Sequence, residues 1–332
     1  MMRLKLYWPT MRAPEFWTKN DFGARALGTV LSPLGALYGL SVRAKEKLTR
    51  AFRPRARVIC VGNLTVGGTG KTPVAMALGR MLVGQGKRVV FLTRGYGGRA
   101  SGPLQVDHKS HSAKDVGDEP LLLASIAPTV VARDRARGAA LADALGAEII
   151  VMDDGFQNFS IAKDLSLIVI DTNVGFGNRR LVPAGPLREW PTAGLSRAHG
   201  VVLIGGGEHN LTSFEGAILR ARIKTHECPM LEGRKVLAFS GIGQPEKFYR
   251  TLAELGATVV GKRDFPDHHH FTTMEIEELK TRADALGAHL VTTEKDFVRL
   301  ETAAREGVLA VPIRAVFDDA AAFAALLKRH AL

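Results

Sequence analysis

A glycine-rich segment near residue 65 combines residue types that bind phosphate. It reads VICVGNLTVGGTGKTP over residues 58–73, so an apolar run enters a turn and a helix can begin at the lysine. Glycines let consecutive backbone N–H groups converge on phosphate oxygens, Lys71 supplies a positive charge to the β and γ phosphates, and the Thr72 hydroxyl can bind Mg²⁺. The partial positive charge of a helix N-terminus adds to this attraction. We therefore predict a nucleotide-binding loop made of Thr65, Val66, Gly67, Gly68, Thr69, Gly70, Lys71 and Thr72.

The loop departs at one position from the usual pattern G-x-x-x-x-G-K-[ST]. The pattern has a glycine at the first position, where this chain has Thr65. A strand-to-helix turn that binds no ligand is the alternative interpretation. The run GGTGKT after an apolar strand argues against it, so we interpret the segment as a variant P-loop.

Two neighbouring carboxylates end a second apolar run. The residues IIVMDD at 149–154 match the Walker-B arrangement, in which an acid at the end of a strand lies beside the Mg²⁺ of the nucleotide. Either Asp153 or Asp154 could serve. An aspartate in this position also commonly caps a turn, but the P-loop upstream favours the metal role.

Two further polar motifs are candidates for the site. The run GDEP at 117–120 opens a helical stretch with Asp118 and Glu119, and acids there often only stabilise the helix dipole, so the residues alone leave both interpretations open. The run TRGYGG at 93–98 follows an apolar run. It puts Arg94 and Tyr96 on a loop at the edge of the sheet where open α/β folds bind ligands.

Three consecutive histidines, His268 to His270, follow Asp267. Neighbouring residues in an extended chain point to opposite faces, so these side chains cannot all bind one metal ion. One of them paired with a carboxylate would form a proton relay, which we consider the better hypothesis.

Apolar runs alternate with helical patterns along most of the chain, which predicts an α/β fold with a parallel sheet flanked by helices. The pattern restarts after three glycines at 205–207 and predicts a second, smaller α/β unit. We divide the chain into an N-terminal membrane-associated segment, a P-loop core domain and a smaller C-terminal α/β domain, at 1–55, 56–230 and 231–332. The expected strands lie near 58–61, 89–92, 149–152, 167–170, 201–204, 236–239, 259–260 and 290–293, with C-terminal helices near 246–255 and 274–286.

The N-terminal segment has an apolar stretch followed by basic residues. The stretch 26–42 carries no charge but is interrupted by Pro33, so it falls short of a membrane-spanning helix. Ser32 and Pro33 predict a helix start, and Leu34 and Leu37 follow at helical spacing with Tyr38 and Val42. We expect an interfacial helix whose basic end meets anionic lipid headgroups; the alternative is a helix packed on its own domain. The basic residues are Arg43, Lys45, Lys47, Arg50, Arg53, Arg55 and Arg57.

The composition restricts the partners of the chain. A net charge of +12 favours an anionic partner, which could be a nucleotide, a nucleic acid or an acidic membrane. Nucleic acid is not expected, because no recognition motif occurs and aromatic residues make up only 7% of the 332 residues. Two cysteines, Cys60 and Cys228, are too few for a disulfide framework or a four-cysteine zinc site.

The assembled motifs resemble those of the tetraacyldisaccharide 4'-kinase family, the lipid A 4'-kinases, over nearly the whole chain. The resemblance implies transfer of the γ-phosphate of ATP to the 4'-hydroxyl of a tetraacyldisaccharide 1-phosphate, a glycolipid, with Mg²⁺ as cofactor. It also implies that the enzyme acts at the cytoplasmic face of the bacterial inner membrane, with the N-terminal helix lying in the membrane surface. The matching segments are VGNLTVGGTGKTP, TRGYGG, GDEP, DDGFQ (153–157), PAGPLRE (183–189), FPDHHHF (265–271) and TTEKD (292–296).

The resemblance also implies roles for single residues. Asp118 matches the base that accepts the proton of the sugar hydroxyl, and His268 matches its partner. Lys71 and Thr72 match the phosphate lysine and the magnesium hydroxyl, and Glu119 and Asp154 match acids near the metal. The implied substrate-binding positions are Arg94, Tyr96, Asp153, Gln157, Arg188 and Glu189.

Two other protein classes share parts of this pattern. A regulatory or chaperone-type P-loop NTPase hydrolyses nucleotide as a switch, but its deviant loop has a lysine where this chain has Val66. The guanine-reading pattern N/T-K-x-D is also missing, since Lys295 is followed directly by Asp296. A peripheral membrane-binding module would leave the P-loop and the segment 153–157 without a role.

Overall fold

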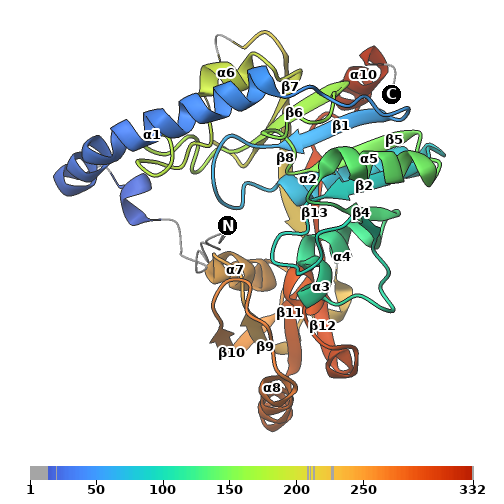
Figure 1. Ribbon diagram of the computed structural model, residues 1–332. Helices are drawn as coiled ribbons and strands as arrows, with labels where there is room; N and C mark the ends of the chain where they lie inside the picture. The colour runs from blue at the N-terminus through green and yellow to red at the C-terminus, as the bar shows by residue number, and fades with distance from the viewer. Residues whose placement is uncertain are drawn as a thin grey trace, which may run out of the picture.

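Two sheets organise the protein (Figure 1). The structure is a computed structural model that describes residues 14–19, 21–207, 209, 211, 214–225 and 228–330. Within these residues a nine-stranded sheet has the order β13-β8-β7-β6-β1-β5-β2-β4-β3, and a four-stranded sheet has the order β10-β9-β11-β12. The larger sheet contains β1 (Arg57–Gly62), β2 (Val89–Thr93), β3 (Leu104–Gln105), β4 (Thr129–Val131), β5 (Ile149–Asp153), β6 (Leu165–Asp171), β7 (Gly200–Ile204), β8 (Ala217–Thr225) and β13 (Ile313–Phe317).

Helices cover both faces of the larger sheet, because its central strands are apolar on both sides. Ile59 and Val61 of β1 belong to the core that includes α2 and α10. Val58 and Cys60 of the same strand belong to the opposite core, which includes α5. The predicted α/β class with a parallel sheet is confirmed. The helices are α2 (Lys71–Gly84), α3 (Ala113–Val116), α4 (Asp118–Ala124), α5 (Arg135–Ala144), α6 (Pro191–Leu195) and α10 (Ala320–Arg329).

The central parallel strands bring the predicted motifs to one edge of the sheet. β1 pairs in parallel with β5 on one side and β6 on the other, and β5 also pairs in parallel with β2. The segments that follow these strands therefore emerge at the same edge, where open α/β folds bind ligands. The loops after β1, β2 and β5 are the glycine-rich loop, the Arg94 loop and the segment that begins at Asp154.

The smaller sheet forms a second α/β unit, as the restart of the pattern after residue 207 predicts. Its core contains Phe239, Leu279 and Leu290, and its strands pair in parallel. Its elements are β9 (Lys235–Ser240), α7 (Pro245–Glu254), β10 (Thr258–Asp264), α8 (Thr273–Ala285), β11 (His289–Thr293), α9 (Glu294–Phe297) and β12 (Val308–Val311). Short 3-10 turns lie at Glu15–Trp17, Pro229–Leu231 and Thr302–Arg305.

The C-terminal end of the chain returns to the larger sheet. β13 pairs antiparallel with β8, and Phe323 of α10 is buried in the core of the larger sheet. The sequence-based division places all residues after 230 in the smaller unit, so the structure differs there over 313–329. The change of sheet occurs at Pro312, between β12 and β13, where the ring removes a backbone donor that would continue the ladder.

The N-terminal helix α1 (Phe22–Leu48) starts earlier than the sequence pattern predicts. Asp21 caps it by accepting a hydrogen bond from the Ala24 backbone N–H, so the predicted start at Ser32 and Pro33 is wrong and Pro33 lies inside the helix. A side chain from outside the helix stabilises the turn before the proline: Arg180 donates to the Gly28 carbonyl at 2.9 Å and also bonds the Ser32 hydroxyl. Among the described residues, no helix is long and apolar enough to cross a membrane.

Small residues dock α1 on the larger unit. Its buried residues are Ala24, Gly28, Gly35 and Gly39. A Cβ atom at Gly39 would lie 2.5 Å from the Leu181 side chain and would also collide with Trp190. The helix therefore packs through its glycines. The leucines of the predicted apolar face point away from the protein: Leu34 is 54% and Leu37 is 64% exposed.

Candidate active site

The glycine-rich loop joins β1 to α2 in the arrangement that the motif predicts. Gly70 caps α2 with a left-handed backbone (φ 88°), and Lys71 is the first helical residue. Lys71 Nζ lies 3.5 Å from the Gly67 carbonyl and 3.9 Å from Asp154 Oδ1. The lysine thus folds back over its own loop, where it can meet phosphate oxygens.

Thr65, the residue that replaces the first glycine of the pattern, is buried and forms a bridge with Leu187. Beside it, the Val66 backbone N–H donates to the Pro186 carbonyl at 2.8 Å. Within the loop, the Asn63 side-chain amide donates to the Thr69 hydroxyl at 3.0 Å. The start of the loop is therefore held by backbone contacts with the PAGPLRE segment.

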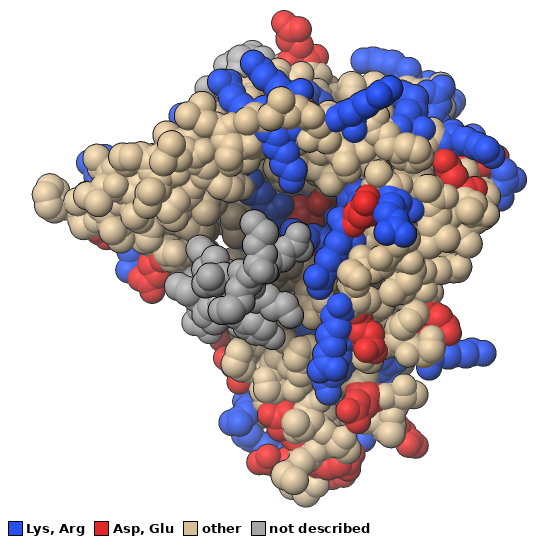
Figure 2. All heavy atoms as spheres, in the orientation of Figure 1, with Lys and Arg blue, Asp and Glu red and all other residues tan. Residues whose placement is uncertain are grey.

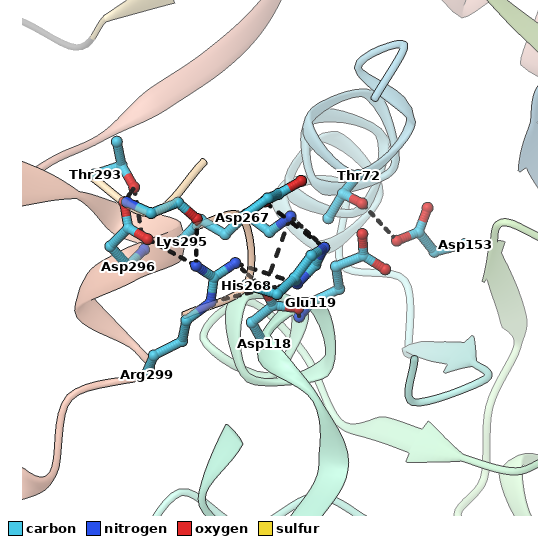
Figure 3. Close-up of polar contacts among 11 residues, drawn as sticks. Thr72, Asp118, Glu119, Asp153, Asp267, His268, Thr293, Lys295, Asp296 and Arg299 are labelled. Carbon is cyan, nitrogen blue, oxygen red and sulfur yellow. Dashed lines mark hydrogen bonds and ion pairs between the residues drawn. The ribbon is translucent and has the colours of Figure 1, made fainter. Parts of the chain in front are cut away.

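The Thr72 hydroxyl donates to Asp153 Oδ2 at 2.9 Å (Figure 3). Asp153 is buried at the end of β5, and its other oxygen, Oδ1, has no hydrogen-bond partner among the described residues. Burial and the nearby charges of Glu119 and Asp154 raise the pKa of Asp153 to about 7, against the opposing effects of Lys71 and Thr72. The carboxyl therefore needs a cation to be fully ionised at neutral pH.

Glu119 adds a second acid on the same side of the loop. Burial raises the pKa of Glu119, and the charge of Asp118 raises it further. Within the described residues no three histidines, cysteines or acids are grouped closely enough to hold a metal ion by themselves. A hydroxyl with one or two carboxylates suits Mg²⁺, which keeps water and phosphate oxygens as its other ligands.

Asp154 faces a different partner from its neighbour. It has a left-handed backbone (φ 51°), and its Oδ1 accepts a hydrogen bond from Arg188 Nη1 at 2.7 Å. Gln157 donates to Glu189 Oε1 at 2.9 Å and to the Asn63 carbonyl at 2.8 Å. The DDGFQ and PAGPLRE motifs thus meet beside the P-loop and form one polar wall.

Asp118 and His268 lie together although they are 150 residues apart. His268 Nδ1 is 3.1 Å from Asp118 Oδ2, and this contact joins α4 of the larger unit to the loop after β10 of the smaller one. His268 also has a left-handed backbone (φ 60°), which is unusual for a residue with a side chain of this size. Residues with such uncommon backbone conformations cluster at functional sites. The other two histidines do not share this contact: His269 bonds Glu275, and for His270 no hydrogen bond is formed within the described part of the chain.

Burial raises the pKa of Asp118, but the hydrogen bond with His268 and the charges of Lys295 and Arg299 outweigh it. The pKa of this carboxyl consequently lies well below its usual range. Asp118 is ionised at neutral pH and ready to accept a proton from a hydroxyl that is losing it.

The TRGYGG loop packs against the turn before Asp118. Gly117 has a φ of 92°, and a Cβ there would collide with the Tyr96 carbonyl, so only glycine allows the approach. The Tyr96 ring lies edge-on to His268 with centroids 5.8 Å apart, and it is 60% exposed. Arg94 is exposed on the same loop and available to an anionic ligand.

Three cationic residues near the site are absent from the sequence-based set. Arg135 is buried, and burial together with the Arg94 charge lowers its pKa to about 10. Lys295 Nζ is 3.7 Å from Asp118 Oδ2, and Arg299 is bonded to the same oxygen. The TTEKD motif at 292–296 marks the segment that carries Lys295, but nothing in it shows that this segment reaches Asp118.

Known proteins are similar to this chain over most of its length. The chain is 51% identical over 310 residues to the tetraacyldisaccharide 4'-kinase of Paramagnetospirillum magneticum, covering 91% of this chain and 94% of that protein. It is 49% identical over 327 residues to that of Rhodospirillum rubrum, covering 96% and 98%. A solved structure of LpxK from Aquifex aeolicus in complex with ATP matches with a TM-score of 0.74 and 29% identity, covering 92% of this chain and 99% of that one. The model of the tetraacyldisaccharide-1-P 4'-kinase family matches residues 27–331, and this chain therefore belongs to that family.

Proposed function

We propose that this chain transfers the γ-phosphate of ATP to the 4'-hydroxyl of a tetraacyldisaccharide 1-phosphate presented at the cytoplasmic face of the bacterial inner membrane. The observation that carries this proposal is the contact of Asp118 with His268 beside the P-loop. A carboxylate ionised and oriented next to a phosphate-binding loop suits an acceptor hydroxyl, whereas a switch that only hydrolyses nucleotide needs no such acceptor site.

The P-loop side of the site would bind ATP. Lys71 and the backbone of the glycine-rich loop hold the phosphates and attract the charge that develops during transfer. Thr72 and Asp153 would hold Mg²⁺, with Glu119 on the same side, because Asp153 Oδ1 is buried without a partner among the described residues. Asp154 fits this role less well, since it is paired with Arg188. Mg²⁺, when bound, neutralises charge on the transferring phosphate.

The opposite side of the site would orient the sugar. Asp118 accepts the hydroxyl proton late in the transfer, when the bond to phosphorus is forming, so a strongly basic group is not required. His268 holds the carboxylate in place. Arg94, Tyr96, Gln157, Arg188 and Glu189 are the proposed substrate contacts. Of these, Tyr96 lies beside His268 and Arg188 bonds Asp154, whereas Glu189 is buried and bonded to Gln157 and Arg197, so it would act by orienting Gln157.

α1 would contact the membrane surface that holds the lipid portion of the substrate. Figure 2 shows the projecting part of this helix with few charged side chains. Leu34 and Leu37 of the same helix are exposed. An exposed apolar face followed by basic residues is the pattern of a helix that lies in a membrane surface. The docked glycines of the same helix would keep the site close to that surface.

The decisive assay is labelled ATP incubated with the purified protein and a mixed bacterial lipid extract. We expect label in one glycolipid, and none with the Lys71→Ala protein. Release of labelled phosphate into solution with no labelled lipid would instead support the nucleotide-hydrolysing switch.

A further inference from the structure

Arg299 is a buried arginine that connects the two α/β units (Figure 3). Its side chain is 2% exposed and lies just after α9 of the smaller unit. Its Nε donates to Asp118 Oδ2 of the larger unit at 3.0 Å, and Nη2 bonds the same oxygen. The two residues are 181 positions apart, so only the packing of one unit on the other creates this contact.

The smaller unit holds Arg299 in a fixed orientation. Its Nη1 donates to Asp296 Oδ1 at 2.7 Å and to the Gly241 carbonyl at 2.8 Å. Asp296 is itself fixed, because its Oδ2 accepts hydrogen bonds from the Thr293 hydroxyl and the Gly241 backbone N–H. A guanidinium is planar, so bonds on one side of it determine where the other side points.

These contacts leave the two oxygens of Asp118 in different situations. Oδ2 accepts from Arg299, contacts His268 Nδ1 at 3.1 Å and lies 3.7 Å from Lys295 Nζ. Within the described residues, Oδ1 accepts only one hydrogen bond, from the Glu119 backbone N–H at 2.9 Å. Oδ1 is therefore the oxygen with capacity for a substrate hydroxyl.

Lys295 completes the arrangement through the histidine. Its Nζ is 3.4 Å from His268 Nε2, and an ammonium can only donate. With Nε2 as the acceptor, neutral His268 carries its proton on Nδ1 and donates it to Asp118. In this tautomer His268 Nδ1 and Arg299 Nη2, 3.3 Å apart, are both donors and form no hydrogen bond with each other. Both therefore donate to Asp118.

We propose that Arg299 is a positioning residue for the phosphate transfer: it occupies Asp118 Oδ2 and thereby presents Oδ1 to the acceptor hydroxyl. The inference rests on the proposed function, in which Asp118 accepts the hydroxyl proton. It also makes the base dependent on the smaller unit, which contributes Arg299, Lys295 and His268 to a carboxylate that belongs to the larger one.

The test is a double-mutant cycle on kcat for transfer from ATP to the glycolipid. Arg299→Gln should lower kcat about 10- to 100-fold, as for other groups that orient a reacting side chain. The KM for ATP should change by less than about twofold, since a group acting through the base matters in the transition state rather than in nucleotide binding. In an Asp118→Asn background the same substitution should cost less than about threefold, because the group it orients is already gone. Equal losses in both backgrounds, or an unchanged kcat, would overturn the proposal.

Stability needs its own comparison, because removing Arg299 leaves Asp296 buried without its counter-charge. Arg299→Gln combined with Asp296→Asn removes both charges, and its kcat is compared with that of Asp296→Asn alone by the same criteria. Arg299→Lys keeps the charge but lacks the planar fork, so its kcat should fall between those of the wild type and the Gln variant. A Lys variant as fast as the wild type would contradict the requirement for the guanidinium.

Arg234→Gln is the matched control, since this exposed arginine lies just before β9 in the same unit. It should retain wild-type kcat and melting temperature. Wild-type protein that labels no glycolipid would overturn the proposed function itself. Labelled glycolipid together with an unaffected Arg299→Gln variant would overturn only the role of Arg299.

Discussion

The neighbouring acids Asp153 and Asp154, at the end of β5, have different roles although they are adjacent in the sequence. Asp153 lies on the Thr72 side of the loop, and Asp154, with its left-handed backbone, turns to Arg188. β5 ends at Asp153, and the left-handed backbone at Asp154 turns the next side chain toward Arg188. The role of each acid in this motif is therefore decided by backbone geometry at a single residue.

Asp118→Asn is expected to lower kcat about 10²- to 10⁴-fold, the usual contribution of a general base. The amide cannot accept the hydroxyl proton, yet it fits the same space. The KM for ATP should change little, because a base acts in the transition state. Steady-state kinetics with varied ATP check this, and a change confined to ATP affinity would make Asp118 a nucleotide or metal contact instead.

The raised pKa of Asp153 predicts that Mg²⁺ binding depends on pH. Below about pH 7 the carboxyl holds a proton that the cation must displace, so Mg²⁺ affinity should rise with pH up to about 7 and then level off. For the metal-free protein, the contribution of Asp153 to folding stability changes with pH in the opposite direction. The folded state holds this proton more tightly than the unfolded state, so the stability it contributes is complete below about pH 3.8 and is lost as pH rises to about 7.

Calorimetry of Mg²⁺ binding at several pH values, in buffers of different ionisation enthalpy, measures both the affinity and the released proton. The release should approach one proton per Mg²⁺ near pH 6 and vanish near pH 8. An affinity that stays constant from pH 6 to 8 would remove Asp153 from the metal site.

At the scale of elements, α1 combines two surfaces with different neighbours. Its glycines contact the Leu181 and Trp190 region, while Leu34 and Leu37 remain exposed. The docked-helix and membrane interpretations are thus compatible, because they use different faces of one helix. This separation lets the two roles be changed independently.

Leu34→Glu with Leu37→Glu is expected to weaken flotation with liposomes while the melting temperature stays within about 2 °C of the wild type. Both side chains are exposed, and surface substitutions usually change stability by less than about 0.5 kcal/mol. Activity on detergent-dispersed substrate should persist.

Gly39→Leu is the converse variant. Its side chain would collide with Leu181 and Trp190, so the melting temperature should fall and activity should drop equally on dispersed and bilayer substrate. Equal flotation of the wild type and the double Glu variant would refute the membrane role of the exposed leucines.

For the whole molecule, the net charge of +12 predicts a salt-dependent affinity for anionic vesicles. Each basic residue near an anionic surface contributes about 1 kcal/mol, which ionic strength screens. Release by salt should be partial, because burial of apolar side chains on α1 does not depend on ionic strength. Flotation with anionic and neutral vesicles at low and high salt measures this, and equal binding to both kinds at low salt would contradict it.

Local features of the sequence determined much of this protein. The P-loop is one continuous segment in which strand, glycines, lysine and threonine are neighbours along the chain, so its geometry follows from short-range backbone preferences. The central strands were predictable for a similar reason, since a strand buried on both faces must be apolar throughout. The edge strands β3 and β13, and β8 beside β13, are partly exposed and lack that requirement, and their places in the sheet were not predicted.

Only the tertiary structure decided how the two units share one site. Asp118 meets His268 and Arg299 across 150 and 181 residues, and no local preference of the chain specifies such contacts. The histidine run could not reveal which ring faces the base, because that depends on the left-handed turn at His268 and on the packing of the smaller unit. Buried ion pairs across an interface arise from the burial of apolar surface around them, and that burial exists only once both units have folded and packed together.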